Sequence, residues 1–535
     1  MVSLAAFARQ KKIVSFSWEW QGSGPAELQE LQPKIAATGL DGIGIRAFFE
    51  RNGKRVQSNE VCEDNCTYEE MRPEIEKYRK VLGKPGLTDC FLNSFYVPKR
   101  RFDWKDDAAW AKVRDNMRLR ARYAKEAGCV GLYVDHEDYP GQRQFVRIPG
   151  DPPMEELVPI VRRRGREVFE AVFQEFPDAK LFFFWFMTEH AKRFNGAAKP
   201  LRALGDANLL WVFFANGILD AMPPQARIYD GNECSYEYKS GDFEYLIQAN
   251  AIREMDRFAY PENRTKYTSQ VLPSTALFLE MYCRTNSAIQ WYRPPFAGSR
   301  LGMFRRDLKQ ALDSVDEYIW TFGGHHPYIR RTIGPEVNSW HRKIWSAKTY
   351  DEMMPGFNRA MIAIKDPVRF LDEIYPEMMR SPNAPTNLVS PDIPANKNWQ
   401  VKPKKGRAPG TFTLDNEVFG NAAPSVRIEG VPEGCAFPDK GVKVQAGEIY
   451  VFHVRTKVKS GGFSANVKWS RGAKPRHFEP VTALSFGKPD ERGWRTGRAV
   501  VTVPENVDRM NLLFSVYQEP GEVCWVDDVE IIRVD

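Results

Sequence analysis

Three segments of the sequence place acidic side chains directly after an apolar, strand-like run. Asp135 and Glu137 follow the first run, Asp230 and Glu233 follow the second, and Glu280 lies at the end of the third. Cleavage of a glycosidic bond needs two such acids, because one carboxyl group protonates the leaving oxygen while the other attacks the anomeric carbon or activates a water molecule. The pattern therefore predicts a carboxylate site at the ends of several strands.

The two acids of the first segment stand two residues apart, and this spacing assigns them roles. Side chains two apart on a strand point to the same side, and two negative charges that close raise the pKa of one of them. We therefore expect Glu137 to be the general acid and Asp135 to tune its pKa. Glu233 is the first candidate for the partner carboxylate and Glu280 the second. The plainer alternative for each acid is a helix cap or an ion pair with an arginine.

Aromatic and hydrogen-bonding residues gather at the same predicted strand ends, and we expect them to shape the subsites for a sugar. This set comprises Trp18, Trp20, Arg46, Asn93, Tyr139, Asn232, Trp320 and His325. Aromatic residues make up 13% of the chain, a content that suits stacking on sugar rings, although most of the rings must lie in the core. The pair His325 and His326 lacks a third ligand at zinc spacing, so local hydrogen bonding is favoured over metal binding.

The elements that must position these residues alternate between strand-like and helix-like segments. Strands are predicted at 13–20, 42–48, 90–97, 130–135, 180–187, 227–230, 276–281 and 318–322. Eight such repeats predict an α/β fold, a (β/α)8 TIM barrel, in which the active site lies at the carboxyl ends of the strands. A doubly wound open sheet is the alternative, but the sequence lacks the glycine-rich motifs of its nucleotide-binding versions.

A change in composition divides the chain after residue 380. From 381 to 410 Pro, Asn, Ser and Lys dominate and the helical periodicity vanishes, which indicates a linker. Short alternating runs separated by turn residues follow, and they predict a β-sandwich of the jelly-roll type. We therefore expect a barrel domain at 1–380, a linker at 381–410 and a β-sandwich at 411–535.

The overall composition excludes several classes of partner. The net charge of +7 comes from 76 basic and 69 acidic residues, and the basic runs are short and scattered, so we expect no nucleic-acid partner. No apolar run is long enough to cross a bilayer, so we expect no membrane partner. The remaining expectation is an enzyme that needs no organic cofactor and has a carbohydrate as its partner, with the oligomeric state left open.

Three stretches resemble a family of secreted barrel glycoside hydrolases from polysaccharide-degrading bacteria. They are Phe102-Asp103-Trp104 with Asp106-Asp107, the segment from Gly131 to Tyr139, and Arg162-Arg163-Arg164; the stretch from Asp230 to Glu233 is also similar. The resemblance covers the barrel part of the chain. It implies hydrolysis of O-glycosidic bonds in a polysaccharide or oligosaccharide. It also implies a secreted or periplasmic location, with the signal peptide absent from this sequence.

The chain is similar, more broadly, to the clan of barrel glycosidases with an acid/base Glu after strand four and a nucleophile Glu after strand seven. That similarity implies Glu137 and Glu280 as the catalytic pair. The clan usually has Asn before the acid, whereas His136 stands there in this chain. The choice between Glu233 and Glu280 as partner of Glu137 therefore stays open.

The tail resembles the jelly-roll carbohydrate-binding modules that follow many such enzymes. The residues that carry this resemblance are Gly493-Trp494, the strand from Ala499 to Pro504, and Val526-Asp527-Asp528-Val529. The resemblance implies a structural calcium near Asp527 and Asp528. Two alternatives to a hydrolase remain: a glycan-binding protein on a degenerate barrel, which releases no product, and a polysaccharide lyase, which leaves unsaturated ends.

Overall fold

The computed structural model describes residues 10–58, 61–63, 65–95, 98, 100–138, 143–238, 244–288, 292–296, 298–330, 343–389, 406, 409–432, 434–436, 441–472, 474–475 and 482–534. The chain divides into two compact units, the first comprising residues 1–294 and 307–355 and the second 295–306 and 356–535. The second unit includes the helices before residue 381, which the composition change had assigned to the first domain.

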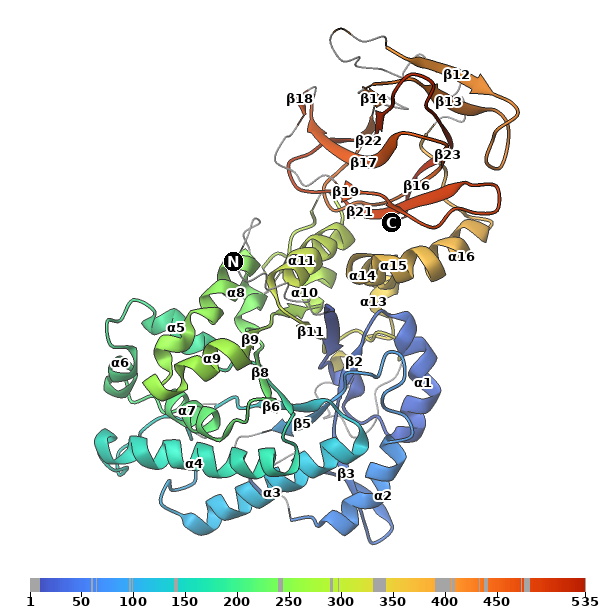
Figure 1. The fold of residues 1–535 in the computed structure, drawn as a ribbon. Helices are drawn as coiled ribbons and strands as arrows, with labels where there is room; N and C mark the ends of the chain where they lie inside the picture. Colours follow the sequence, from blue (N-terminus) through green and yellow to red (C-terminus); the bar gives the residue numbers. More distant parts are fainter. Residues whose placement is uncertain are drawn as a thin grey trace. The chain divides into compact units, whose positions relative to one another are not determined.

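A parallel sheet forms the centre of the first unit (Figure 1). Its strands are β1 (Lys12–Ser15), β2 (Gly42–Ile45), β5 (Phe91–Phe95), β6 (Gly131–Asp135), β7 (Lys180–Phe183), β8 (Arg227–Asp230), β9 (Val271–Pro273), β10 (Ala276–Phe278) and β11 (Tyr318–Phe322). They are ordered β10-β11-β1-β2-β5-β6-β7-β8-β9. Only Ser274 and Thr275 separate β9 from β10, the two ends of this order, so the sheet curls until its edges adjoin.

The prediction of an α/β fold on a parallel sheet is confirmed. The predicted strands at 227–230 and 318–322 agree with β8 and β11 residue for residue. The predicted strand at 180–187 is too long, since β7 ends at Phe183. The apolar run continues past that end because Phe186 and Met187 are as deeply buried as β7 itself. An apolar run therefore marks burial here, and not the extent of the strand.

Aromatic rings fill the interior of the curled sheet. Phe16, which follows β1, stacks on Tyr133 of β6 with ring centroids 4.5 Å apart, and it lies 5.1 Å from Phe182 of β7. Trp320 of β11 stacks on Phe184 at 4.5 Å and 7°. Since β1 is a neighbour of neither β6 nor β7 in the sheet, rings from these strands that meet must occupy the inside of the curl.

A network of charges lies at the amino ends of the strands, opposite the predicted site. Lys12 pairs with Asp89 at 2.7 Å, and Lys180 pairs with Glu317 at 2.6 Å. The hydroxyl of Tyr318 receives a hydrogen bond from Lys180 at 2.7 Å and donates one to Asp89. Two cations and two anions thus balance each other where the strands begin.

Helices and one hairpin follow the strands of the first unit. The helices are α1 (Pro25–Ala37), α2 (Tyr68–Tyr78), α3 (Asp107–Ala127), α4 (Met154–Glu175), α5 (Thr188–Phe194), α6 (Pro200–Asp206), α7 (Trp211–Ala221), α8 (Glu244–Arg253), α9 (Arg264–Gln270), α10 (Glu280–Cys283) and α13 (Tyr350–Met353), together with the part of α11 (Arg300–Ser314) from residue 307 on. The hairpin pairs β3 (Ala47–Arg51) with β4 (Lys54–Ser58). Helix ends follow local rules: Asp106 caps α3 by accepting from the amide of Ala109 at 3.0 Å, and Gly128 ends it in the left-handed region.

Helices α4 and α7 cross at two glycines, which let their backbones touch. A Cβ on Gly217 would lie 2.0 Å from the carbonyl oxygen of Arg162, and one on Gly165 would lie 2.2 Å from that of Phe214. We expect Gly217→Ala to push the helices apart and to lower the free energy of unfolding by about 1–3 kcal/mol, measured by urea unfolding. Gly205→Ala in α6 is the matched control, because its Cβ would meet only the end of the Met154 side chain at 3.8 Å.

The second unit is built from two antiparallel sheets. One has the order β12 (Thr411–Asp415), β13 (Ser425–Glu429), β23 (Val523–Arg533), β16 (Ile449–Val458), β21 (Arg495–Thr502) and β20 (Ser485–Phe486). The other contains β14 (Gly434–Ala436), β22 (Arg509–Tyr517), β17 (Gly462–Arg471) and β18 (Lys474–Pro475), with β15 (Val442–Lys443) on β22 and β19 (Thr482–Ala483) on β17.

The two antiparallel sheets share one hydrophobic core, as a sandwich does. Phe452 and Val426 of the first sheet belong to the same buried cluster as Val467 and Phe514 of the second. Strands β17 and β22 alternate buried and half-buried residues, the period-two pattern seen in the sequence. The helical segment α14 (Phe357–Lys365), α15 (Pro367–Arg369), η5 (Phe370–Ile374) and α16 (Tyr375–Arg380) precedes the sheets. Among the described residues, no helix is long and apolar enough to cross a membrane.

Candidate active site

Three predicted acids come together at the carboxyl ends of β6 and β8. Asp135 is the last residue of β6, and the backbone amide of Glu137 donates to its Oδ1 at 3.2 Å. The negative charges of Glu137 and Asp135 both raise the pKa of Glu233, which follows β8, so all three carboxyl groups lie within electrostatic reach of one another. His136, between the first two, turns to the other side and stacks on Trp211 of α7 at 3.6 Å.

Burial and mutual repulsion keep two of these acids protonated. Burial raises the pKa of Asp135 from 3.8 to about 8, and the charge of Glu137 adds to the rise, while the Glu137 amide and Arg46 oppose it. Burial also raises the pKa of Glu233 well above its ordinary value, and the charges of Glu137, Asp135 and Glu189 raise it further. Asp135 and Glu233 therefore hold their protons at a higher pH than ordinary carboxyl groups, which is what a general acid needs.

A tyrosine that the sequence analysis missed lies among the acids. Tyr236 stands one turn after Glu233 in the short helix η2 (Glu233–Glu237) and is 8% exposed. Burial raises its pKa well above the ordinary value, and the charges of Glu233, Glu137, Glu280 and Asp135 contribute. Its ring packs 5.1 Å from Phe278. The spacing of three residues from Glu233 is the signal that would have identified it.

Arg46 and Asn93 lie on the β2 and β5 side of the same acids. The guanidinium of Arg46 donates to the side-chain oxygen of Gln21, and burial lowers its pKa while the charges of Tyr133 and Asp135 oppose this. Asn93 is 5% exposed and hydrogen-bonds Tyr133. Burial raises the pKa of Tyr133 to about 12. These side chains thus form a polar wall beside Asp135, and a role for Arg46 and Asn93 in binding a sugar stays a prediction.

Two of the predicted sugar-contacting tryptophans belong to the core, which corrects that expectation. Trp20 has no exposed surface, and its Nε1 donates to Ser15 at 3.0 Å. Trp320 is also fully buried, and its Nε1 donates to the carbonyl of Gly231 at 2.7 Å, just before Glu233. Through this hydrogen bond, Trp320 fixes the backbone segment that leads to Glu233. Trp18 is half-buried and keeps surface that a ligand can reach.

The remaining predicted binding residues have mixed placements. Asn232 is 1% exposed, and its Nδ2 donates to the hydroxyl of Tyr238 at 2.7 Å, so it fixes the turn before Glu233. His325 is half-buried; burial lowers the pKa of its ring and the charge of Glu280 opposes this. Tyr139 lies outside the described residues.

Glu280 serves the loop that follows β11. Its Oε1 accepts hydrogen bonds from the backbone amides of Gly324 at 2.9 Å, His325 at 2.6 Å and His326 at 3.1 Å, and from the hydroxyl of Tyr350 at 2.8 Å. The side chain is 2% exposed. A buried carboxylate that accepts four hydrogen bonds at one oxygen holds the loop in place. This structural role favours Glu233 over Glu280 as the catalytic partner of Glu137.

A second buried acid, Glu19, anchors the next part of the same loop. Its carboxylate accepts the amides of Tyr328 at 2.6 Å, Ile329 at 3.0 Å and Arg330 at 2.7 Å, and it is 1% exposed. Glu19 was not among the predicted site residues, because an acid between Trp18 and Trp20 carries no sequence pattern that marks it as buried. Together Glu19 and Glu280 hold residues 324–330 against the carboxyl ends of β1 and β10.

The Glu19 anchor makes stability depend on pH. Burial raises its pKa from 4.5 to about 7, although the three amides oppose this, so its contribution to stability is present below pH 4.5 and is lost as pH rises through 7. Glu19→Gln places an NH2 group against amide donors and is expected to cost about 1–3 kcal/mol at pH 5. The loss should be smaller at pH 8. Urea unfolding at both pH values, beside the exposed control Glu30→Gln, measures it.

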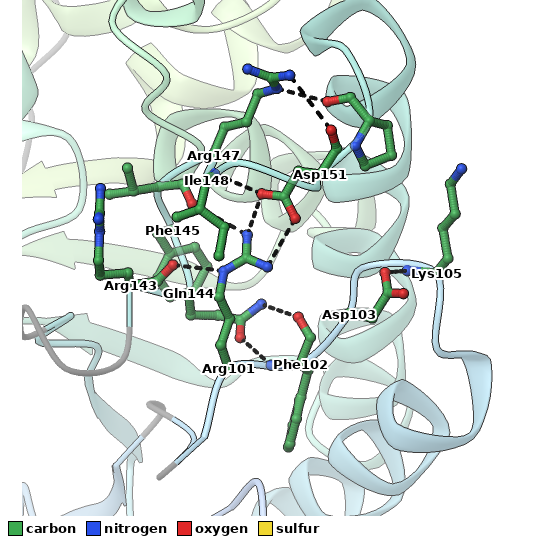
Figure 2. A network of polar contacts seen from close by, with 12 residues as sticks. Arg101, Phe102, Asp103, Lys105, Arg143, Gln144, Phe145, Arg147, Ile148 and Asp151 are labelled. Atoms are coloured by element: carbon green, nitrogen blue, oxygen red, sulfur yellow. Dashed lines mark hydrogen bonds and ion pairs between the residues drawn. The ribbon is translucent and has the colours of Figure 1, made fainter.

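The loop that carries Glu137 is braced by an arginine network (Figure 2). Arg101 holds Asp151 with two hydrogen bonds, of 3.0 and 2.7 Å, and donates to the carbonyl of Arg143 at 2.9 Å. Gln144 joins the backbone of Phe102 through its side chain, accepting at 2.8 Å and donating at 3.3 Å. These hydrogen bonds join the loop after β5 to the loop after β6, which also carries Glu137.

In the second unit, Asp527 and Asp528 are engaged by protein donors. Asp527 Oδ2 accepts the amide of Gly420 at 2.5 Å, and Asp528 Oδ2 accepts that of Asn421 at 3.1 Å. The guanidinium of Arg455 lies 3.8 Å from Asp528 and donates to the side chain of Asn421 at 3.0 Å. Within the described ranges, no group of three potential metal ligands occurs. An arginine therefore lies where the resemblance implies calcium, so these residues fit a cation poorly.

Comparisons with known proteins give remote likenesses. No protein-family model and no curated protein matches the chain. Among solved structures, it is similar to the D-allulose 3-epimerase of Methylomonas sp. (12% identity, 67% of this chain and 98% of that one, TM-score 0.33). It is also similar to a family 61 carbohydrate-binding module in complex with β-1,4-galactotriose (16%, 28% and 99%, 0.20).

A third likeness is to the enzymatically active domain of tailspike protein 4 from bacteriophage CBA120 (15% identity, 26% of this chain, TM-score 0.22). The match spans only 20% of that chain. All three TM-scores are low, so the fold is assigned from the strand order and from the buried core residues of each unit.

Proposed function

We propose that the first unit is a (β/α)8 barrel that hydrolyses O-glycosidic bonds of a polysaccharide or oligosaccharide. The observation that carries this proposal is the convergence of Asp135, Glu137 and Glu233 at the carboxyl ends of β6 and β8, where burial and neighbouring charge raise the pKa of Asp135 and of Glu233. The carboxyl ends of strands are where barrels of this kind hold their active sites. Two carboxyl groups of different protonation are what glycoside hydrolysis needs.

The electrostatics favour a reversal of the roles expected from the sequence. Glu233 keeps its proton near neutral pH, because burial and the surrounding negative charges raise its pKa, and it is the general acid that protonates the leaving oxygen. Glu137 supplies one of the negative charges that hold the protons on its neighbours, and it acts as the ionised partner. Asp135, protonated at neutral pH, positions Glu137 through its amide.

The steps follow from these roles. Glu233 gives its proton to the glycosidic oxygen as the bond to the anomeric carbon breaks, while Glu137 attacks that carbon or takes a proton from the attacking water. Tyr236, amid the acids, and the Arg46–Asn93 wall orient the sugar hydroxyls. Where Glu137 attacks, a water molecule then breaks the bond between Glu137 and the sugar, and Glu233 takes the proton of that water and so recovers its own; where Glu137 acts on water, the resulting hydroxide adds to the sugar directly. The proposal also places the protein outside the cytoplasm, where polysaccharides are found, as the family resemblance implies.

The test is a screen for the release of reducing ends across a broad panel of glycans. Wild type is run beside Glu137→Gln and Glu233→Gln, two substitutions that keep side-chain size and remove the carboxyl chemistry. Release by wild type and its loss in both variants would support the hydrolase. Unsaturated products absorbing in the ultraviolet would replace it with a lyase, and binding without any product would replace it with a glycan-binding protein.

A further inference from the structure

A pocket of about 840 Å3 lies among helices α4, α7 and α9 of the first unit, beside the crossing of α4 and α7 (Figure 1). Arg162, Arg163 and Arg166 line it from α4, while Asp220 and Lys266 line it from α7 and α9. The volume lies within the range of pockets that bind small ligands, about 300–1,000 Å3. Two arginines of the stretch 162–164 thus line a pocket that contains none of the acids of the candidate active site.

The two acids in the lining, Asp220 and Glu262, are both held by Arg162. The guanidinium donates to each oxygen of Asp220 at 2.7 Å and to Glu262 at 2.6 Å, and it lies 4.2 Å from the centre of the Tyr260 ring. Asp220 also accepts from the side-chain amide of Asn263 at 2.7 Å. These contacts fix one part of the pocket and engage both of its carboxylates, so a ligand that binds here meets a preorganised surface.

Three further cations line the pocket, and nearby anions balance them only weakly. Arg166 is exposed and makes no ion pair with any residue that the structure describes. Arg163, three positions earlier, approaches Asp107 and Glu167 only to 3.7 Å. Lys266 donates to two uncharged backbone carbonyls at the end of α7, at 2.8 and 3.2 Å. Four cations and two acids in the lining leave a net charge of +2, which favours an anionic ligand.

The donors around the pocket define the kind of anion. Side chains three positions apart on a helix are neighbours on its surface, so Arg163 and Arg166 can donate to the same group of oxygens. Guanidinium groups bind phosphate oxygens with paired hydrogen bonds. A phosphate monoester carries a charge of about −1.5 to −2 at pH 7, which matches the lining better than the single charge of a carboxylate does. Burial raises the pKa of Tyr260, although the charge of Arg162 opposes this, so its hydroxyl keeps its proton and can donate as well.

We propose that this pocket binds a small organic molecule through a phosphate monoester, with Arg163 and Arg166 on the phosphate oxygens and Tyr260 as a further donor. The apolar side chains of Val158 and Pro159, which also line the pocket, are available to the organic part of the ligand. The site goes beyond the proposed hydrolysis and does not depend on it, because it shares no residue with the barrel acids.

Calorimetric titrations of the full-length chain test the site. The probes are glucose 6-phosphate, glycerol 3-phosphate and adenosine 5′-monophosphate, each beside its parent compound without phosphate. The sulfate ester of whichever compound binds tests the charge, because it has the same tetrahedral shape and only one negative charge. Arg166→Gln and Tyr260→Phe remove one donor each from the lining. The matched control is Arg202→Gln in α6, which makes the same change of net charge at an exposed position outside the lining.

At least one phosphate ester should bind, and its sulfate counterpart should bind several-fold more weakly. Arg166→Gln should weaken binding of the phosphate ester at least tenfold and Tyr260→Phe about threefold, in the range of a charged and a neutral hydrogen bond. Arg202→Gln should bind like wild type, and the circular dichroism of all three variants should match it.

The phosphate site is refuted if no phosphate ester binds, if Arg166→Gln titrates like Arg202→Gln, or if the sulfate ester binds as tightly as the phosphate ester. Arg166→Gln should also leave any release of reducing ends by the barrel unchanged, so the outcome for this site and the outcome for the proposed hydrolysis are independent.

Discussion

Glu233→Gln is expected to lower kcat/KM for glycoside cleavage by about 10³-fold, within the range that a general acid contributes. The substitution removes the proton that burial and the nearby negative charges hold on this carboxyl group at neutral pH. It keeps the size of the side chain and its backbone contact to Phe184, so the fold should be unchanged. Initial rates of reducing-end release, with circular dichroism as the check of folding, measure the effect.

Glu237→Gln is the matched control for this substitution. Glu237 lies in the same short helix η2, but it is exposed, so its removal should leave the rate near that of wild type. The wild-type rate should persist through neutral pH and fall on the alkaline side, since the raised pKa of Glu233 keeps it protonated there. Near-normal turnover by Glu233→Gln would remove Glu233 from the acid role and return it to Glu137.

Glu317→Gln is expected to lower the free energy of unfolding of the first unit by about 3 kcal/mol, the cost of breaking a largely buried ion pair. Glu317 accepts from Lys180 at 2.6 Å and also from the hydroxyl of Tyr229, and its side chain is 9% exposed. Gln leaves Lys180 without its anionic partner at the amino ends of the strands. Urea unfolding at pH 7 measures the loss.

The exposed substitution Glu254→Gln controls for a change of net charge and should have almost no effect. Burial alone would raise the pKa of Glu317, but hydrogen bonds from Lys180 and Tyr229 outweigh it and hold that pKa below the ordinary value. The stability that Glu317 contributes is therefore present above its unfolded pKa and is lost as pH falls through the folded one. If acidification destabilised Glu317→Gln as steeply as wild type, the network would not be the source of this dependence.

The parallel sheet could be predicted from the sequence because each strand leaves a local signal. The run at 227–230 and the run at 318–322 are bounded by turn residues, and the structure reproduces both. The strand predicted at 276–281 corresponds to β10, whereas β9 (Val271–Pro273) was not predicted, since so short a strand is defined by its pairing with β8. The sequence could not predict that helices α14–α16 belong to the second unit, because an amphipathic pattern does not specify the sheet on which a helix packs.

The candidate site was predictable where a strand end alone specifies a position. Asp135 ends β6, Glu137 and Glu233 lie in the short segments after β6 and β8, and the structure brings the three acids together. The burial of Trp20 and Trp320 could not be predicted, because a tryptophan at the end of a strand gives the same sequence pattern whether its ring points into the core or toward a ligand. The anchoring of Glu280 depends on amides from 324–326, more than forty positions away along the sequence.

The leaving-group dependence of Glu233→Gln tests the central claim most directly. Once the screen has identified the sugar, wild type and Glu233→Gln are compared on its dinitrophenyl glycoside, whose leaving group needs no proton, and on its methoxyphenyl glycoside, whose leaving group does. If Glu233 is the general acid, the variant should approach the wild-type rate on the first substrate and fail on the second. Equal losses on both substrates would contradict this role and with it the assignment of the site.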